Sequence, residues 1–229
     1  MLIVDSLVKS YGGLLAIDNL TFQVEQGIIH AVIGPNGAGK TTLISHLSGE
    51  IKPDAGKVMF DGINISGMDV HLRSAIGIAR SFQITNIFLD LTAHENVALA
   101  VQAHSGHSFK FWKNASKDQE LRQPALEYLQ QVGLENRAEI VAGQLSHGEH
   151  RQLEIAMALA TRPKLLLLDE PMAGMGPKES SEMVEILKEL KGKLTILLIE
   201  HDMDVVFTLA DSITVLVNGR VIATDSPDA

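Results

Sequence analysis

The chain of 229 residues is 45% hydrophobic and 21% charged, a balance typical of globular proteins with enough material for one large domain or two small ones. Its formal net charge is −9, so the chain as a whole lacks the positive charge that attracts nucleic acid. The absence of cysteine excludes disulfides, and no secretory signal or run of about 18 apolar residues is visible, so we expect any link to a membrane to depend on a partner protein.

The beginning of the chain predicts antiparallel strands. Residues 2–24 alternate between apolar and polar positions like two paired strands on either side of a break at residues 11–13. Asp61 and Gly62 lie between two short apolar runs and predict a two-residue hairpin. We therefore expect a small antiparallel sheet to surround the first buried strand.

Residues 34–41 read Gly-Pro-Asn-Gly-Ala-Gly-Lys-Thr and fit the phosphate-binding pattern G-x-x-x-x-G-K-[ST]. The pattern lies between a predicted buried strand, residues 28–33, and a predicted helix, residues 41–48, as this loop requires. Glycines let successive main-chain N–H groups point inward, and the helix adds the positive end of its dipole. Lys40 is expected to reach the β- and γ-phosphates of a nucleoside triphosphate, and the Thr41 hydroxyl to ligate Mg²⁺. The residues expected to bind the nucleotide here are Gly34, Pro35, Asn36, Gly37, Ala38, Gly39, Lys40 and Thr41.

The middle of the chain, residues 85–160, predicts a helical insertion without a convincing strand. Thr92 and Glu95 form a capping box that opens one helix, and residues 121–132 carry helical spacing.

The last third alternates strands and helices. Residues 164–168 and 194–199 are continuous apolar runs, typical of strands buried on both faces. Residues 183–190 place their apolar side chains on one helical face, and Asn218-Gly219 predicts a final hairpin. This alternation indicates an α/β fold with a mostly parallel sheet covered by helices.

Charged side chains follow two of these strands, at the edge where open α/β sheets bind their ligands. Asp169 is expected to orient Mg²⁺, and Glu170, which should point to the other side of the strand, to polarise the attacking water. His201 is expected to hydrogen-bond the γ-phosphate or the water and to hold Glu170 in line. The alternatives are a charged strand end that faces solvent and a structural histidine.

A second anion-binding helix start is predicted at residues 145–149, Leu-Ser-His-Gly-Glu. Ser146 and Glu149 form a capping box, which by itself describes an ordinary helix start. Gly148 in the first turn leaves main-chain N–H groups open to an anion. Since the chain already has its own phosphate loop, this second site is best explained if it serves the nucleotide held by another copy.

With these motifs the sequence resembles the ATP-binding cassette (ABC) ATPases along essentially its whole length. Walker A alone would indicate only an NTPase, but five motifs in this order are highly specific. They are Walker A at residues 34–41, the lid loop with Gln83, the signature segment at 145–149, Walker B at 165–170 and the switch histidine His201. Residues 80–88 and 173–179 resemble more narrowly the ATPase subunits of branched-chain amino acid importers.

The resemblance implies one ABC ATPase domain, residues 1–229, with a P-loop NTPase (RecA-like) core. Residues 1–84 and 161–229 would form this core with an antiparallel β subdomain, and residues 85–160 an inserted α-helical subdomain that carries the signature segment. It further implies hydrolysis of ATP with Mg²⁺, which energises an importer for branched-chain or related amino acids.

The resemblance also implies roles for single residues and for partners. Tyr11 would stack on adenine, Thr42 would help to hold the phosphates, and Gln83 would ligate Mg²⁺ and link the γ-phosphate to a transmembrane subunit. Each ATP would lie between the Walker A loop of one copy and a segment of the other, which consists of Ser146, His147 and Gly148. The partners would be a second ATPase subunit (head-to-tail, as homo- or heterodimer), permease subunits that dock on the helical subdomain, and indirectly an extracytoplasmic solute-binding protein. The chain would lie at the cytoplasmic face of the inner membrane, and no nucleic acid is expected.

Two alternative functions remain open, and three positions depart from the family pattern. The alternatives are a soluble ABC ATPase that acts on nucleic acid or ribosomes, and a transporter ATPase for urea, short amides or a lipid-linked substrate. His147 and Glu149 replace the Gly and Gln of the usual Leu-Ser-Gly-Gly-Gln, and Gly176 stands where Asp or Asn is usual. A carboxylate at position 149 is compatible with a nearby γ-phosphate only if it turns back to cap its own helix. Related chains usually continue past residue 229 into a short helical tail, so we expect a tail to be missing here.

Overall fold

The computed structural model describes residues 1–81, 87–104 and 119–228, which fold into two compact units. The first unit comprises Met1–Arg80, Lys164–Glu170 and Leu187–Ala229, and the second comprises Ser81–Pro163 and Pro171–Ile186. The sequence interpretation assigned all of residues 161–229 to the core, whereas Pro171–Ile186 belongs to the helical unit.

A six-stranded sheet lies at the centre of the first unit. Its strands are β3 (Ile29–Ile33), β6 (Ile78–Arg80), β7 (Leu165–Asp169), β8 (Thr195–Ile199), β9 (Ser212–Val217) and β10 (Arg220–Asp225). In the order β10-β9-β3-β8-β7-β6 all neighbours are parallel except β9 and β10. That antiparallel pair turns at Asn218 and Gly219, which both have positive φ, as predicted. Strands β7 and β8 are buried at every residue, which confirms what their apolar runs predicted.

A four-stranded antiparallel sheet completes the strand structure of this unit. Its strands are β1 (Leu2–Tyr11), β2 (Leu14–Val24), β4 (Ala55–Phe60) and β5 (Ile63–Asn64), in the order β2-β1-β4-β5. The predicted hairpin between β4 and β5 is confirmed, since Asp61 and Gly62 adopt φ of 47° and 80°. Two consecutive positive φ values give the turn a twist that matches the flanking strands.

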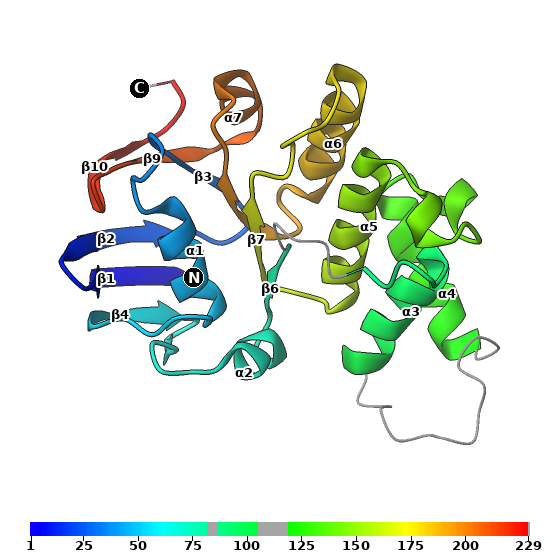
Figure 1. Cartoon of the computed structure of the whole chain (residues 1–229), viewed down its shortest axis with the longest axis horizontal. Coiled ribbons are helices and arrows are strands. Elements are labelled where there is room, and N and C mark those ends of the chain that lie inside the picture. Colours follow the sequence, from blue (N-terminus) through cyan, green and yellow to red (C-terminus); the bar gives the residue numbers. More distant parts are fainter. Residues whose placement is uncertain (82–86, 105–118, 229) are drawn as a thin grey trace. The chain divides into compact units, whose positions relative to one another are not determined.

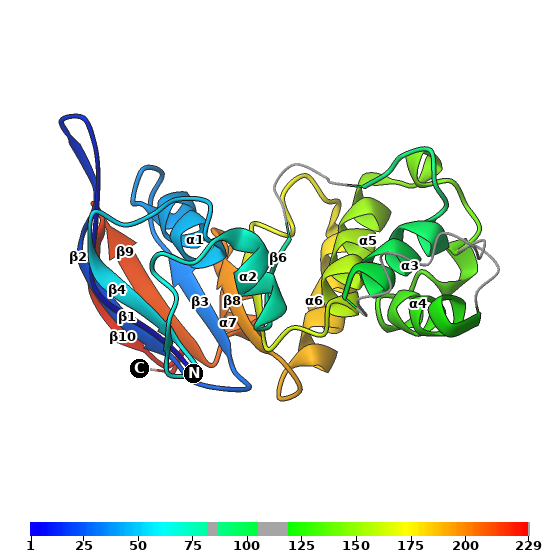
Figure 2. The same ribbon diagram turned by 90° about the horizontal axis from the view of Figure 1, so that it is seen from below.

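Helix α1 (Lys40–Ser48) lies between the four-stranded sheet and β3, as Figures 1 and 2 both show. Side chains from α1 and from both sheets share one hydrophobic core. Strand β3 contributes Val32 to this core, while the alternate residue Ala31 packs with Val206 of helix α7 (Met203–Leu209). Both faces of β3 are thus covered, and the position of α1 is set by apolar packing along its length. The residues that α1 contributes to the core are Leu43, Ile44 and Leu47.

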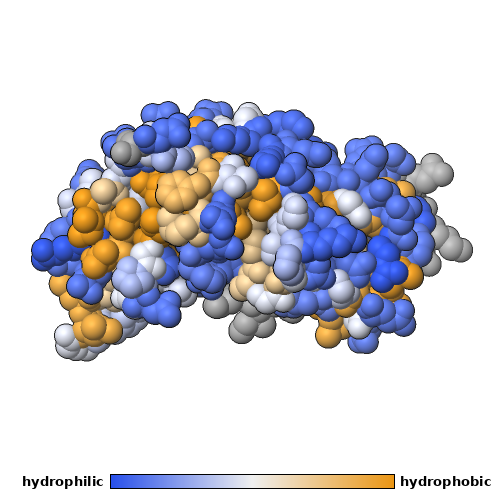
Figure 3. Space-filling view, turned by 90° about the horizontal axis from the view of Figure 1, so that it is seen from above, coloured by the Kyte–Doolittle hydropathy of each residue, from blue (hydrophilic) through white to orange (hydrophobic). Residues whose placement is uncertain are grey.

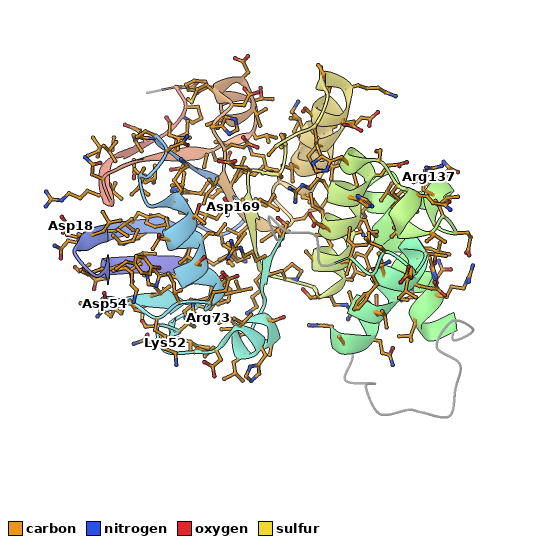
Figure 4. The ribbon with its side chains drawn as sticks, viewed as in Figure 1. Asp18, Lys52, Asp54, Arg73, Arg137 and Asp169 are labelled. Carbon is orange, nitrogen blue, oxygen red and sulfur yellow. The ribbon has the colours of Figure 1, made fainter. Side chains whose placement is uncertain are left out.

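The C-terminal end of α1 is fixed by a buried arginine. Arg73 comes from helix α2 (Val70–Ala75) and is only 1% exposed (Figure 4). Its guanidinium donates to the carbonyls of His46 and Leu47 at the end of α1, where helical C=O groups lack intrahelical partners. Burial lowers the pKa of Arg73 to about 10, so the group stays charged at neutral pH. This contact holds the far end of the helix that begins at the phosphate loop.

Two buried histidines predict that the fold loses stability in mild acid. His30 and His46 are each 1% exposed, and burial lowers the pKa of each imidazole to about 4. The unfolded chain takes up these protons near pH 6.5, whereas the folded chain does so only near pH 4. Stability should therefore be constant above pH 6.5 and fall as the pH drops through this window, by about 2 kcal/mol for each histidine at pH 5.

The measurement is the midpoint of urea unfolding between pH 7.5 and 5. The variant His46→Leu removes one titrating group from a buried site, and it should remove about half of the pH dependence. His94, which is also buried and whose Nε2 contacts the carbonyl oxygen of Arg122, provides the control variant His94→Gln. A pH dependence that survives in His30→Gln/His46→Leu would contradict the assignment.

The second unit is built from helices. They are α3 (Ala93–His104), α4 (Gln119–Gln131), α5 (His147–Ala160), the 3-10 turns Glu135–Arg137 and Ala142–Gln144, and α6 (Pro177–Leu190), whose last residues lie in the first unit. The predicted capping box of α3 is confirmed, because the Thr92 N–H donates to Glu95 Oε2 and the Glu95 N–H to Thr92 Oγ1. In the described part of residues 85–160 the strand-like pairing is limited to an isolated bridge between Thr92 and Val141.

Candidate functional site

The loop at residues 34–39 requires glycine at both ends. A Cβ atom on Gly34, whose φ is 155°, would lie 2.0 Å from the carbonyl oxygen of Leu216. A Cβ atom on Gly39, whose φ is 105°, would lie 2.7 Å from the carbonyl oxygen of Ala16. The main chain of the loop therefore packs directly against the main chain at Leu216 and Ala16. Gly39 leads directly into the first turn of α1. Such an arrangement presents N–H groups and the positive end of a helix dipole to an anion.

Lys40 belongs to the same loop. Its side chain is mostly buried, and Nζ donates to the carbonyl oxygens of Gly34 at 2.6 Å and Pro35 at 3.1 Å. The ammonium group is thus held over the loop rather than in solvent. The next residue, Thr41, is exposed, and Thr42 is half-buried. A cation and two hydroxyl-bearing residues therefore follow the glycines directly.

Asp169 is the last residue of β7 (Figure 4) and is 6% exposed. Its Oδ2 atom lies 3.3 Å from Nη2 of Arg80, the last residue of the neighbouring strand β6. Burial raises the pKa of the Asp169 carboxyl and the Arg80 guanidinium opposes this rise, while the Glu170 carboxylate adds to it. The carboxylate oxygens of Asp169 at this strand end are ligands of the kind that a divalent cation prefers.

Glu170 corrects one part of the sequence interpretation. Strand β7 ends at Asp169, and Glu170 has a left-handed φ of 50° with its N–H donated to the carbonyl of Ile199. The alternation of side chains along a strand therefore does not decide where Glu170 points. A non-glycine residue with positive φ at such an edge is uncommon, and conformations of this kind cluster at functional sites.

His201 lies close to two carboxylates, and its main-chain N–H donates to Glu200 Oε2 at 3.0 Å. Its Nδ1 atom is 3.8 Å from Glu170 Oε1 and 3.7 Å from Glu200 Oε2. The side chain is 65% exposed, whereas Glu200 is almost completely buried. The structure thus brings His201 and Glu170 together, as the sequence interpretation requires, and leaves the imidazole accessible.

These groups fit a nucleoside triphosphate with a divalent cation. Glycine main chain, an ammonium and a helix N-terminus are suited to phosphate, and the buried Asp169 is suited to the metal ion. Tyr11 ends β1 and is 48% exposed, with Lys9 Nζ 5.6 Å from its ring centroid. Gln83 lies outside the described residues.

The signature segment, Leu145 to Glu149, belongs to the second unit and begins α5. Its predicted capping box is confirmed, because the Ser146 N–H donates to Glu149 Oε2 at 2.7 Å and the Glu149 N–H donates to Ser146 Oγ at 3.2 Å. Arg137 (Figure 4) also binds Glu149, with Nε 2.8 Å from Oε1. Burial raises the pKa of the Glu149 carboxyl, but the Ser146 N–H and Arg137 hold it below its ordinary value. Glu149 thus turns back to cap its own helix, as its compatibility with a phosphate requires.

Glu179 contacts the same segment and was not identified from the sequence. Its Oε1 accepts from Ser146 Oγ at 3.3 Å and its Oε2 from the Gly176 N–H at 3.1 Å. A Cβ atom on Gly148 would lie 2.7 Å from Glu179 Cδ, so only glycine fits there without a shift. The sequence does carry a signal for Glu179, because Pro177 at the first helical position and Glu two residues later mark a helix start. His147 bonds the carbonyl of Ala173 through Nε2 at 3.1 Å.

Comparisons with known proteins agree on one kind of relative. A family model described as ABC transporter matches residues 17–173. The chain is 37% identical to the high-affinity branched-chain amino acid transport ATP-binding protein BraF of Pseudomonas aeruginosa, over 98% of this chain and 91% of the relative. It is 36% identical to the high-affinity branched-chain amino acid transport ATP-binding protein LivG of Escherichia coli, over 100% of this chain and 92% of the relative.

Solved structures show the same similarity in three dimensions. An ATP-binding cassette of an ABC transporter in its ADP conformation matches with a TM-score of 0.87 and 32% identity, over 99% of this chain and 91% of the other. A dimeric cassette in a post-hydrolysis state, bound to ADP and Pi, matches with a TM-score of 0.84 and 28% identity, over 99% of both chains.

Proposed function

The chain belongs to the ABC transporter family, and from this premise we propose that it is the ATP-hydrolysing subunit of an importer for branched-chain or related amino acids. We infer the class of cargo from the similarity of nearly the whole chain to two branched-chain amino acid transport ATP-binding proteins. The chemistry is supported by one compact unit that contains both the glycine loop with Lys40 and the strand end with Asp169 and Glu170, where the Lys40 charge acts on the Asp169 carboxyl.

In the proposed site the loop and Lys40 bind the phosphates, and Thr41 with Asp169 holds Mg²⁺. When bound, Mg²⁺ neutralises charge on the phosphate oxygens. Glu170 accepts a proton from the attacking water, and His201 orients the water or the γ-phosphate. Such chemistry needs positioning and charge stabilisation rather than a covalent intermediate. The proposed ATP and Mg²⁺ ligands from this copy are Tyr11, Gly34, Pro35, Asn36, Gly37, Ala38, Gly39, Lys40, Thr41, Thr42, Gln83 and Asp169.

The proposal includes a second copy, or a similar subunit, that closes each site. Ser146, His147 and Gly148 at the start of α5 would face the ATP held by the partner, since a helix N-terminus with an accessible hydroxyl suits a γ-phosphate. The dimeric relative bound to ADP and Pi supports association of two cassettes. We therefore expect the monomer to bind ATP and to hydrolyse it poorly.

Mixing two inactive variants tests this shared site. Ser146→Asp keeps an N-cap acceptor for α5 but places a carboxylate against the γ-phosphate, so it should inactivate hydrolysis without unfolding the helix. Lys40→Ala should be inactive for lack of its own phosphate contact. In a mixed dimer one site combines the intact loop of the first variant with the intact signature segment of the second. Phosphate release should recover to at most about a quarter of the parental rate, because half of the dimers are mixed and each has one good site.

The control for this experiment is Ser146→Thr, which keeps both the cap and the hydroxyl and should remain active. No gain on mixing, or parental activity of Ser146→Asp alone, would contradict a site shared between two copies.

The proposed membrane partners are permease subunits, with an extracytoplasmic solute-binding protein that delivers the amino acid. None of the helices in the described parts of the chain has the length and apolar character needed to cross a membrane. The face seen in Figure 3 is largely hydrophilic and carries separate hydrophobic patches. Exposed apolar groups support protein contacts, and on the helical unit Phe88 and Leu89 are 56% and 52% exposed. We place the chain at the cytoplasmic face of the membrane, where these side chains would contact the permease.

A further inference from the structure

The structure assigns to Arg80 a role as a positioning residue for the metal-binding carboxylate Asp169, which it ties to helix α1 of the phosphate loop. One nitrogen of the guanidinium, Nη2, faces Asp169 Oδ2 at 3.3 Å. A second nitrogen, Nη1, donates at 2.6 Å to Oε1 of Glu50, which lies just beyond the C-terminal end of α1. Arg80 therefore joins the strand end that would hold the cation to the helix that begins at the phosphates.

The α1 side of this bridge is built from several polar groups. Arg80 Nη1 also lies 3.3 Å from both Ser45 Oγ and Ser48 Oγ, and Ser45 Oγ donates to Glu50 Oε2 at 3.0 Å. The Arg80 side chain is 9% exposed and the Asp169 side chain 5% exposed. A charged pair at this depth is held in one geometry and is weakly screened by salt. The position of the guanidinium is thus set by three groups at the end of α1 and by Asp169 rather than by solvent.

Arginine suits this bridge for a geometric reason. Its planar guanidinium presents donors in a rigid fork, so that one group binds two carboxylates in fixed directions at the same time. Lysine offers one compact charge on a flexible stem, which can approach either Asp169 or Glu50 but cannot hold both in the same way. Partners that orient a metal-binding carboxylate typically change metal affinity or activity by about 10- to 100-fold when they are removed.

This inference rests on the proposed function, in which Asp169 holds Mg²⁺. Arg80 does not touch the nucleotide in this role. Its loss should leave the contacts of Lys40 and the loop with phosphate in place and weaken only the metal-dependent part of binding. A merely structural arginine would instead lower stability and all forms of nucleotide binding together.

The test measures metal binding apart from turnover. In a Glu170→Gln background loaded with ATP, Mn²⁺ is titrated by electron paramagnetic resonance, and ATP affinity is measured separately in EDTA. Arg80→Met should weaken Mn²⁺ binding about tenfold and leave ATP affinity in EDTA unchanged. Arg80→Lys should give an intermediate loss. Glu50→Gln, which weakens the ion pair beyond the end of α1 but keeps Arg80, should give a smaller loss in the same direction.

Further variants distinguish a failure of the role assigned to Arg80 from a failure of the proposed metal site. Asp169→Asn should weaken Mn²⁺ binding by itself, and adding Arg80→Met to it should cause no further loss if Arg80 acts through Asp169. Arg122→Gln, which breaks an exposed pair with Glu139, is the matched control and should change nothing. An unchanged Mn²⁺ affinity in Arg80→Met, with Asp169→Asn still defective, would overturn the role of Arg80. An unchanged affinity in Asp169→Asn would overturn the proposed metal site instead.

Discussion

Replacement of Lys40 by alanine is expected to abolish ATP binding at micromolar concentrations. The ammonium is mostly buried and held at the loop by the carbonyls of Gly34 and Pro35, so it is in place to bind phosphate oxygens. Hydrogen bonds to charged groups contribute about 1.5–3 kcal/mol each, and the loss of two corresponds to at least a hundredfold in affinity. Isothermal titration with ATP measures the effect directly.

The control for Lys40→Ala is Lys57→Ala, which removes an exposed lysine that pairs with Asp5. It should bind ATP like the parental chain. Thermal unfolding of both variants shows whether Lys40→Ala is folded, since its carbonyl partners lose their donor. If folded Lys40→Ala bound ATP within a factor of about two of the parental affinity, the assigned role would be contradicted. Such a factor corresponds to much less free energy than one hydrogen bond to a charged group contributes.

Replacement of Glu170 by glutamine is expected to stop turnover while ATP binding continues. Glutamine keeps the shape of the side chain but cannot accept the proton of the attacking water. Loss of a general base typically lowers the rate by about 10²- to 10⁴-fold. Because the ATP is not consumed, the dimer that it closes should persist, and light scattering after gel filtration should show twice the mass of the monomer only when ATP is present.

The matched control is Glu139→Gln, a change of the same chemistry at an exposed glutamate of the helical unit. It should hydrolyse ATP at the parental rate. If Glu170→Gln also hydrolysed ATP at that rate, Glu170 would not be the base. The nearby imidazole of His201, which is 3.8 Å from Glu170 Oε1, would then be the next group to replace.

Local sequence determined most of the secondary structure and the identity of the nucleotide loop. Hydrophobic period and turn chemistry act between neighbours, so the buried runs of β7 and β8, the hairpins at Asp61-Gly62 and Asn218-Gly219, and the capping boxes all formed as predicted. The turn of Glu149 back onto the Ser146 N–H also follows from the first turn of one helix. These features depend on residues a few positions apart, which the sequence displays directly.

The tertiary structure alone decided the features that join distant segments. The strand pattern gave no sign that Glu170 would take a left-handed φ, because this conformation accompanies its bond to Ile199 on a neighbouring strand. Arg80 and Asp169 are 89 positions apart, and Ser146 and Glu179 are 33 apart. Such pairs meet only when strand order and helix packing bring their backbones together, and neither period nor spacing encodes that order. The sequence by itself therefore predicted the phosphate-binding loop and the charged strand ends, while the pairing of β6 with β7 decided that Arg80 meets Asp169.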